Sequence, residues 1–419
     1  MQIANFSKIN TKHRILTMKI LYVSVLTSNR LINLLHQNSG KNPGYAVLKF
    51  HRLLARGFVR NSVEFQTLTG LPISRDISQK TWWSMPRETE DGVLYKYIPF
   101  INYPGIRQIC LFLYSFFYTL FWGLGNRKNK TIVCDVLNIS ICMGALWASK
   151  IVGLKSVGIM TDMPGLMVGR NTKTSKNKFR GLIPKINKSY LTSFSEYVFL
   201  TEQMNTAVNI KKRPYIVMEG LVDEKMSDVM STHNEDVQTA NERILLYAGG
   251  LHERYGLKTL VEAFLKLPNE DVRLHLYGDG PFVEELTNNY CKQDKRIIYH
   301  GIVANEEVVK AELKATLLIN PRPTNEEFTQ YSFPSKNMEY MVSGTPILTT
   351  KLPGMPDEYY PYIYTFDNET IEGYTDTLKD VLSKSKEELQ NKGKAAKEFV
   401  LQKKNNVFQA KRIMDLIQL

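Results

Sequence analysis

Residues 319–350 constrain the fold of this chain more than any other stretch. They close an apolar run at 316–319, which predicts a buried strand, cross a polar loop, and restart as a helix at Ser335. Ser335 has the side chain of an N-cap residue, and Gly344 ends the helix before a second apolar strand at 347–349. The sequence therefore predicts one strand–loop–helix–strand unit of a parallel sheet.

Polar side chains gather where this predicted helix begins. Ser335, Lys336 and Glu339 lie in its first turns. In parallel sheets ligands bind at the carboxyl ends of the strands, where helix N-termini offer free amide groups. This end of the unit is therefore expected to take an anion at the helix N-terminus and a sugar hydroxyl at the carboxylate.

The segment PSKNMEYMVSGTPIL resembles the donor-nucleotide site of GT-B-fold glycosyltransferases of family 4, the group that includes bacterial capsule and O-antigen transferases. It combines Pro-Ser-Lys, a Glu three positions after the Lys, and a Gly-x-Pro that ends the helix. The resemblance implies that Glu339 grips the ribose of a nucleotide diphosphate sugar. Many family members carry a second Glu eight positions earlier. Here that position is Tyr331, and Glu326 and Glu327 are off register.

Length and charge narrow the possible architectures and partners. The 419 residues exceed what one hydrophobic core usually covers, so two domains are expected. A formal net charge of +13 favours nucleic acid, an anionic membrane face or a substrate diphosphate, and charge does not choose among them. No helix-turn-helix, zinc or base-stacking signature is present, so no nucleic-acid partner is expected. The cysteines lack metal-ligand spacing, which predicts reduced thiols in a cytosolic protein: Cys110, Cys134, Cys142 and Cys291.

The first half of the chain reads as a doubly wound domain. Residues 1–17 are basic and polar without the apolar core of a signal peptide, so they are expected to be a disordered extension, and residues 18–225 to form the first domain. A strand from Met18, a polar loop and a helix open it. By the resemblance, Gly40 and Gly44 lie where the family has a glycine-rich loop that faces donor and acceptor. A loop that merely needs glycine is the alternative.

The most apolar segment spans residues 109–124 and is too short to cross a bilayer. Arg107 precedes it, and Arg127, Lys128 and Lys130 follow it, which is the pattern of an interfacial helix on anionic lipid. Contact of residues 107–130 with an anionic membrane is therefore one interpretation. The preferred interpretation is a helix buried against the first sheet, because segments of this length usually belong to a core.

A possible catalytic loop follows the strand predicted at 156–160. Family members often have His-Asp here, whereas this chain has Thr161 and Asp162. Asp162 is a candidate to contact the acceptor or donor sugar, and a turn or helix-cap role is the alternative. The resemblance implies a retaining reaction by front-face attack, in which the leaving phosphate accepts the proton, so a separate catalytic base is not required.

The remaining donor-site candidates lie beyond a polar linker at 226–241. The resemblance implies that residues 242–404 bind the nucleotide sugar and that a helix at 405–419 crosses back to the first domain. Glycines that follow two predicted strands would let the backbone approach a diphosphate closely, or they only shape turns. Two arginines would bind the oxygens of the diphosphate, or they make surface ion pairs. These candidates are Gly249, Gly250, Arg254, Gly278, Gly280 and Arg322.

Together these features predict an α/β protein of GT-B architecture, with two doubly wound domains facing across a cleft. The resemblance implies retaining transfer of a sugar from a nucleotide diphosphate, with UDP as the expected carrier, to a lipid-linked or oligosaccharide acceptor in surface polysaccharide synthesis. No metal or cofactor is expected. The expected location is cytoplasmic, and peripheral contact at the inner membrane face through residues 107–130 is the alternative that the basic flanks leave open. The alternatives are a GT-B-fold sugar-nucleotide epimerase and a non-catalytic basic protein that binds nucleotides or nucleic acid.

Overall fold

The computed structural model describes residues 18–39, 45–75, 77–125, 127, 129–163, 189–226 and 242–419. The predicted extension at 1–17, the loop glycines Gly40 and Gly44, and nearly all of the predicted linker at 226–241 lie outside the described residues.

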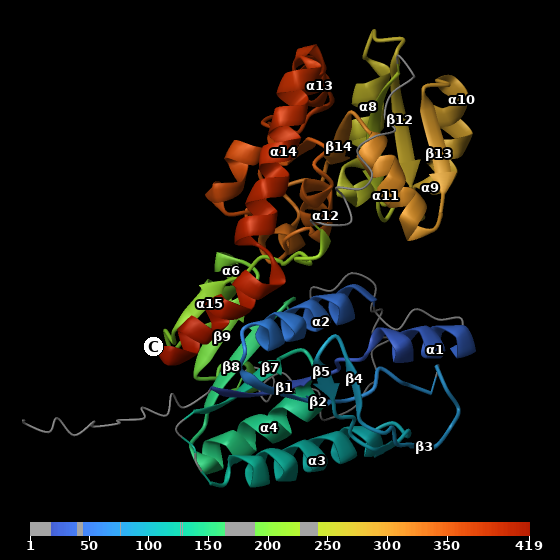
Figure 1. Cartoon of the computed structure of the whole chain (residues 1–419). Helices are drawn as coiled ribbons and strands as arrows, with labels where there is room; N and C mark the ends of the chain where they lie inside the picture. The colour runs from blue at the N-terminus through green and yellow to red at the C-terminus, as the bar shows by residue number, and fades with distance from the viewer. Residues whose placement is uncertain are drawn as a thin grey trace, which may run out of the picture.

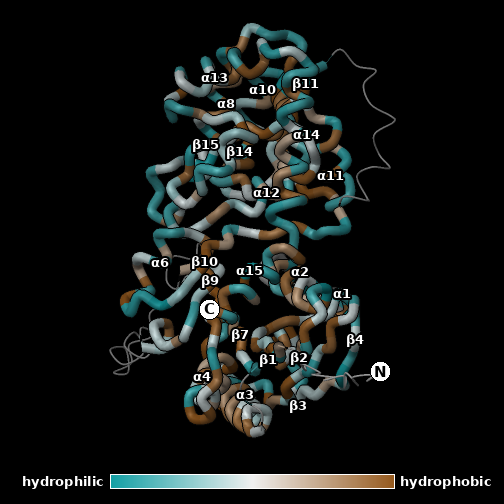
Figure 2. The backbone as a smooth tube through the Cα atoms, turned by 60° about the vertical axis from the view of Figure 1, so that its left-hand side comes forward, coloured by the Kyte–Doolittle hydropathy of each residue, from teal (hydrophilic) through white to brown (hydrophobic). Residues whose placement is uncertain are grey.

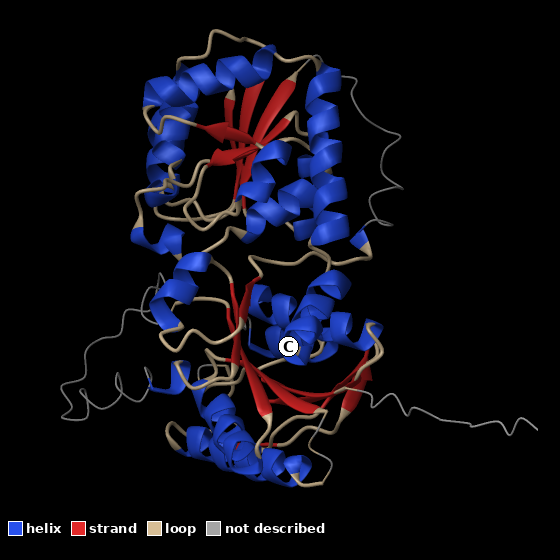
Figure 3. Cartoon of the chain, turned by 90° about the vertical axis from the view of Figure 1, so that its left-hand side faces the viewer, coloured by secondary structure: helices blue, strands red, loops and turns tan. Residues whose placement is uncertain are grey.

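The first domain is built on a parallel sheet whose four central strands are buried along most of their length (Figures 1 and 3). Its strand order is β10-β9-β8-β7-β1-β2, and helices pack on the two sides. Two short antiparallel pairs, β3 with β6 and β4 with β5, lie outside it. The strands are β1 (Lys19–Ser24), β2 (Glu64–Thr69), β3 (Trp82–Trp83), β4 (Glu88–Glu90), β5 (Val93–Tyr95), β6 (Phe100–Ile101), β7 (Lys130–Asp135), β8 (Lys155–Met160), β9 (Glu196–Phe199) and β10 (Tyr215–Val217), and the helices are α1 (Asn29–Ser39), α2 (Tyr45–Arg60), α3 (Ile106–Gly123), α4 (Ile139–Val152) and α6 (Glu202–Val208).

The second domain repeats this plan with the strand order β13-β12-β11-β14-β15-β16, again all parallel. The predicted architecture of two doubly wound α/β domains is therefore confirmed. The strands are β11 (Arg243–Ala248), β12 (Val272–Tyr277), β13 (Ile297–Gly301), β14 (Leu317–Asn320), β15 (Ile347–Thr350) and β16 (Tyr364–Phe366), and the longer helices are α8 (Leu257–Leu265), α11 (Asn305–Lys314), α12 (Ser335–Ser343), α13 (Ile371–Ser383) and α14 (Lys386–Lys403).

The C-terminal helix α15 (Asn406–Gln418) returns to the first domain and packs along α2 (Figure 1). Ala410, Ile413 and Ile417 of α15 belong to the core of the first domain. A Cβ added at Gly57 of α2 would lie 2.1 Å from the carbonyl oxygen of Asn406, so the two backbones touch there. The last helix thus completes a core that begins at the first strand.

A buried ion cluster stabilises the point where the chain crosses between domains. Lys404, which is 3% exposed, forms ion pairs with Glu219 and, at 2.6 Å, with Glu358. The hydroxyl of Tyr359 also donates to Glu219. Beside this cluster, Val222 N donates to the carbonyl of Lys404 at 2.9 Å. Charge and backbone pairing therefore hold both crossing segments together.

The predicted apolar segment at 109–124 forms most of helix α3. We expected this helix to be buried, and that expectation is wrong for one of its faces. Its buried residues are Leu111 and the small residues Ser115, Thr119 and Gly123. A Cβ added at Gly144 of α4 would lie 2.3 Å from the carbonyl oxygen of Phe112, so small residues let the two helices approach closely. The opposite face of α3 is exposed. Among the described helices, none is long and apolar enough to span a membrane.

Candidate functional site

The unit β14–loop–α12–β15 forms as the sequence predicts, and α12 begins at the carboxyl edge of the second sheet. The cap differs from the prediction. Pro334 takes the N-cap position, Ser335 is the first helical residue, and no side chain caps the helix. The Ser335 hydroxyl therefore does not accept a hydrogen bond from the first amide groups of α12. Gly344 ends the helix with a φ of 80°, as a glycine there is expected to do.

Glu339 lies between two lysine side chains that come from different domains. Lys336 Nζ is 3.1 Å from its Oε2, and Lys49 Nζ, on α2 of the first domain, is 3.4 Å from its Oε1. Burial alone raises the pKa of Glu339, but the ammonium groups of Lys336 and Lys49 outweigh burial and keep it below its ordinary value. Glu339 is therefore an ionised acceptor at neutral pH. Sequence reasoning missed Lys49, because nothing local marks it.

A second carboxylate, also missed from the sequence, lies beneath this cluster. Glu312 of α11 is 4% exposed, and burial raises its pKa to about 7, with Lys336 lowering it and Glu339 raising it. The only sequence signal is an acidic residue on the side of α11 that carries its apolar positions. Glu312 therefore exchanges its proton near neutral pH within a group that includes Glu339.

Arg254 is already engaged by an acid. Its Nη2 lies 2.7 Å from Oε2 of Glu326, and its guanidinium lies over the ring of Phe328 at 4.7 Å from the centroid. The sequence predicts Arg254 as a direct donor to phosphate. Glu326 holds that position in the structure, so a phosphate has to compete with a carboxylate for it.

Arg322 has the opposite environment. Its guanidinium lies 4.9 Å from the ring centroid of Tyr255 and 5.5 Å from that of Phe328, and its Nε is buried without a hydrogen-bond partner in the described part of the chain. No carboxylate among the described residues pairs with it. Burial lowers the pKa of this guanidinium, because removal from water disfavours its charged form. An unpaired, half-buried cation at a strand end is suited to an anionic ligand.

The predicted glycines hold two loops together at the same sheet edge. A Cβ at Gly278, which has a φ of 122°, would lie 1.9 Å from the carbonyl oxygen of Gly249. A Cβ at Gly280 would lie 2.2 Å from the carbonyl oxygen of Leu251. These contacts give both glycines a packing role that needs no ligand. Gly250 lacks such a contact, since the nearest atom to its Cβ belongs to the His252 side chain at 3.3 Å.

The loop after β8 is described only at its start. Asp162 accepts a hydrogen bond from Met163 N at 2.8 Å, and burial nevertheless raises the pKa of Asp162 above its ordinary value. The hydroxyl of Thr161 is buried without a partner in the described residues. Neither residue is joined by a hydrogen bond or ion pair of the described chain to the Glu339 cluster. Their catalytic role stays a prediction.

Tyr331 occupies the position where the resembled family has its second Glu. The structure packs Tyr331 of the second domain against the hydrophobic core of the first. The substitution of an aromatic residue for the acid therefore serves the contact between domains. Within the described residues, no three His, Cys, Asp or Glu side chains are grouped to hold a metal ion.

Comparison with known proteins agrees with this arrangement. Residues 242–384 match the family described as "Glycosyl transferases group 1". No curated protein matches the chain at a significant level.

Solved structures resemble the whole chain. HepE of Anabaena in complex with UDP has a TM-score of 0.59 at 15% identity, covering 96% of this chain and 100% of its own. The apo form of WaaB, a lipopolysaccharide outer core galactosyltransferase, has a TM-score of 0.58 at 14% identity, covering 96% and 99%. Sucrose-phosphate synthase of Thermosynechococcus elongatus has a TM-score of 0.60 at 14% identity, covering 96% and 98%. The chain thus has the GT-B fold, and its residues 242–384 match the glycosyl transferases group 1 family.

Proposed function

We propose that the protein transfers a sugar from a nucleotide diphosphate to a saccharide acceptor with retention of configuration. The observation that carries the proposal is the group of charged side chains at the start of α12, within the part of the chain that matches glycosyl transferases group 1. An ionised carboxylate beside lysines at a helix N-terminus suits a ribose linked to phosphates.

Each residue of this group has a distinct task. Glu339, kept ionised by its lysines, accepts hydrogen bonds from the ribose hydroxyls. Lys336 and Arg322 supply positive charge for the phosphates, and the α12 amide groups add donors. This positive charge stabilises the diphosphate as it leaves, which is where negative charge develops. The leaving phosphate oxygen then takes the proton of the acceptor hydroxyl, so the chain need not supply a base.

UDP is the proposed nucleotide, because HepE binds UDP and UDP-glucose in the same fold. The proposed acceptor is lipid-linked, in surface polysaccharide synthesis of the kind carried out by capsule and O-antigen transferases. The resemblance of the α12 segment to family 4 supports this acceptor, as does the apolar face of α3, which suits a protein that works beside a membrane.

The first experiment measures release of UDP from UDP-sugars and binding of UDP by calorimetry. Glu339→Ala is expected to weaken UDP binding by about a hundredfold, since it removes two charge-assisted hydrogen bonds. Glu327→Ala, an exposed acid in the preceding loop, is the matched control and is expected to behave as wild type. Unchanged UDP binding by Glu339→Ala would remove the basis of the proposal.

Product analysis separates the alternatives. NMR of the product is expected to show the donor's anomeric configuration in a new glycosidic bond. A free altered sugar formed without acceptor would identify an epimerase. A salt-sensitive shift of nucleic acid in a gel, without sugar chemistry, would favour the non-catalytic alternative.

A further inference from the structure

An apolar face runs along the outer side of α3. Ile109, Leu113, Phe117 and Phe121 repeat every four residues, and their exposed fractions lie between 46% and 68%. Such spacing places them in one stripe on the helix. Figure 2 shows α3 and α4 as neighbouring hydrophobic tubes at the edge of the first domain. Large contiguous apolar patches on a protein surface mark interaction sites.

Helix α4 extends this face. Trp147 and Ile151, one helical turn apart, are 52% and 66% exposed. The ring of Phe112 on α3 meets the ring of Trp147 edge to face, with centroids 5.3 Å apart. The exposed apolar surface therefore belongs to two helices packed together, which makes it broad as well as long.

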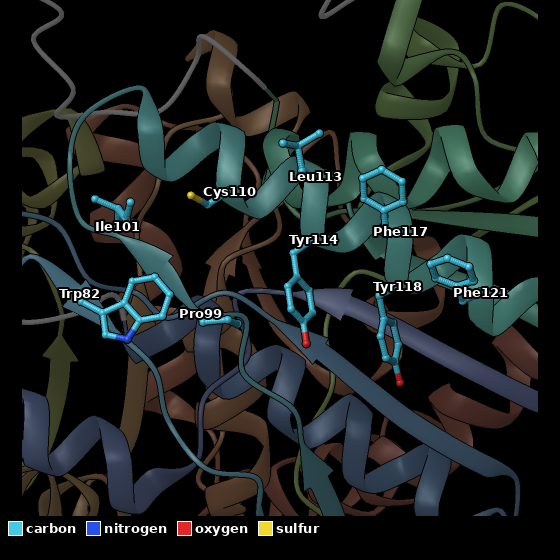
Figure 4. A pocket seen from close by; sticks show the side chains of 9 residues that line it. All are labelled: Trp82, Pro99, Ile101, Cys110, Leu113, Tyr114, Phe117, Tyr118 and Phe121. Atoms are coloured by element: carbon cyan, nitrogen blue, oxygen red, sulfur yellow. The ribbon is translucent and has the colours of Figure 1, made fainter.

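A groove of about 440 Å³ opens beside the stripe, between α3 and the β3–β6 pair (Figure 4). Its walls are apolar and aromatic, with Trp82 and Ile101 on one side and Leu113, Phe117 and Phe121 on the other. A groove lined in this way suits a hydrocarbon chain better than a polar ligand.

The charges around the face select its partner. Residues 92–161 contain seven Lys and Arg residues and one acid, Asp135, whose side chain is buried. Lys96 Nζ lies 3.7 Å from the ring centroid of Tyr118, and Arg127 and Lys150 are exposed beyond α3 and on α4. Arg107, predicted to flank the membrane, instead turns inward and donates to the carbonyl of Leu71 at 3.0 Å. Two copies of so basic a surface repel one another, whereas an anionic lipid surface attracts it.

We infer that the outer face of α3 and α4 docks this protein onto an anionic lipid bilayer, with the groove receiving a lipid hydrocarbon chain. The apolar stripe enters the boundary between headgroups and acyl chains, while the surrounding lysines and arginines reach the anionic headgroups. Docking of this kind is reversible and leaves α3 lying on the membrane, not across it. It deepens the proposed function by placing the enzyme beside a lipid-linked acceptor, but binding to vesicles needs no substrate.

The fluorescence of the tryptophans provides a direct readout of membrane binding. All four, Trp82, Trp83, Trp122 and Trp147, lie on β3, α3 and α4. The test mixes the full chain with vesicles of phosphatidylcholine containing phosphatidylglycerol, and with vesicles of phosphatidylcholine alone. Expected results are sedimentation with the anionic vesicles, a blue shift of the fluorescence, and quenching by lipids brominated on the acyl chain. Raising the salt from about 0.1 M to about 1 M is expected to weaken binding, because it screens the headgroup attraction.

Substitutions locate the docking face. Phe117→Ser/Phe121→Ser is expected to weaken vesicle binding by about tenfold or more, because two exposed aromatic side chains are lost from the buried area. Leu34→Ser/Phe408→Ser removes two exposed apolar side chains elsewhere and is expected to bind as wild type. Circular dichroism melting checks that both variants fold.

Four results would overturn the inference: no binding by the wild type, unquenched fluorescence, equal binding by the α3 variant, or a wild-type dimer that this variant abolishes in the absence of lipid. Glu339→Ala is expected to bind vesicles normally. Failure of the proposed reaction and failure of membrane docking are therefore distinguishable.

Discussion

At the candidate donor site, single side chains of the same type differ in their partners and in their burial. Arg322, enclosed by Tyr255 and Phe328, lacks an acidic partner in the described chain, whereas Arg254 pairs with Glu326. Glu339 faces two lysines, and Glu312 lies buried close by. These two contrasts of partner and burial indicate which side chains are available to a ligand.

Arg322→Met is expected to weaken UDP binding by about ten- to a hundredfold, since a charge-assisted contact to phosphate is lost. The unbranched methionine still packs between the two rings, so the free energy of unfolding is expected to stay the same or to rise. Calorimetry and urea unfolding measure the two effects. Arg254→Met is the control and is expected to lose less affinity. Equal affinities of wild type and Arg322→Met would show that this arginine does not contact the nucleotide.

Glu312 gives the protein a pH-dependent stability. Its folded pKa, about 7, lies above the unfolded value, so the folded state binds more protons between about pH 4.5 and about pH 7. Stability is therefore expected to fall by about 2 to 3 kcal/mol as the pH rises through this window. Glu312→Gln is expected to remove that fall, while Glu306→Gln, at an exposed position of α11, is expected to keep it. Urea unfolding curves across the window provide the measurement, and a parallel pH profile for Glu312→Gln would contradict the assignment.

At the scale of elements, two helix contacts complete the first domain beside its sheet. One is the close pair α3–α4, and the other is the packing of the crossing helix α15 along α2. The α3–α4 contact depends on glycine and small side chains, which bring two backbones together while leaving the large apolar residues of α3 outside. The small residues on one side of α3 therefore explain both its close packing on α4 and the exposure of its large apolar side chains.

Gly144→Ala tests this contact. The added methyl group meets the carbonyl oxygen of Phe112, so α3 has to move away, and the free energy of unfolding is expected to fall by about 2 kcal/mol. At Gly70 an added Cβ finds its nearest neighbour, a Leu111 methyl, at 3.4 Å, so Gly70→Ala is a tolerated control in the same domain. Thermal melting of both variants measures the difference. Identical melting temperatures would mean that the helices are not in backbone contact.

At the scale of the whole molecule, contacts between described residues join the two domains at several points. The ion cluster of Lys404 lies at the crossing, Lys49 of the first domain pairs with Glu339 of the second, and Thr201 donates to the carbonyl of Gln330 at 3.0 Å. We expect a nucleotide bound at Glu339, as proposed, to displace Lys49, so that donor binding and domain contact would compete for one carboxylate.

Lys404→Met leaves Glu219 buried without its cation. The free energy of unfolding is expected to fall by about 3 to 5 kcal/mol, because an uncompensated carboxylate remains inside the protein. The double variant Lys404→Met/Glu219→Gln keeps a partner for Tyr359 and removes the charge, so it is expected to recover most of the loss. Denaturant unfolding of wild type, single and double variants measures the coupling. Failure of the double variant to recover would place the effect in packing instead of charge.

Much of the fold was open to prediction from the sequence because its signals are local. Apolar runs separated by helical periodicity specify parallel strands with crossover helices, and Pro-Ser-Lys with Glu339 marks the helix that carries the candidate donor site. These patterns depend on neighbours within a few residues, so the chain itself carries them.

The rest depended on which distant residues meet. Lys49 and Glu339 are 290 positions apart in the sequence, and Arg254 and Glu326 are 72 positions apart. No rule based on sequence spacing predicts either pair. The apolar length of α3 predicted burial, yet only the packing of α4 against one side decided that the other side stays exposed. The sequence by itself therefore determined the elements and the residue types at the site. The tertiary structure alone decided charge pairing and exposure, because both depend on neighbours that folding brings together.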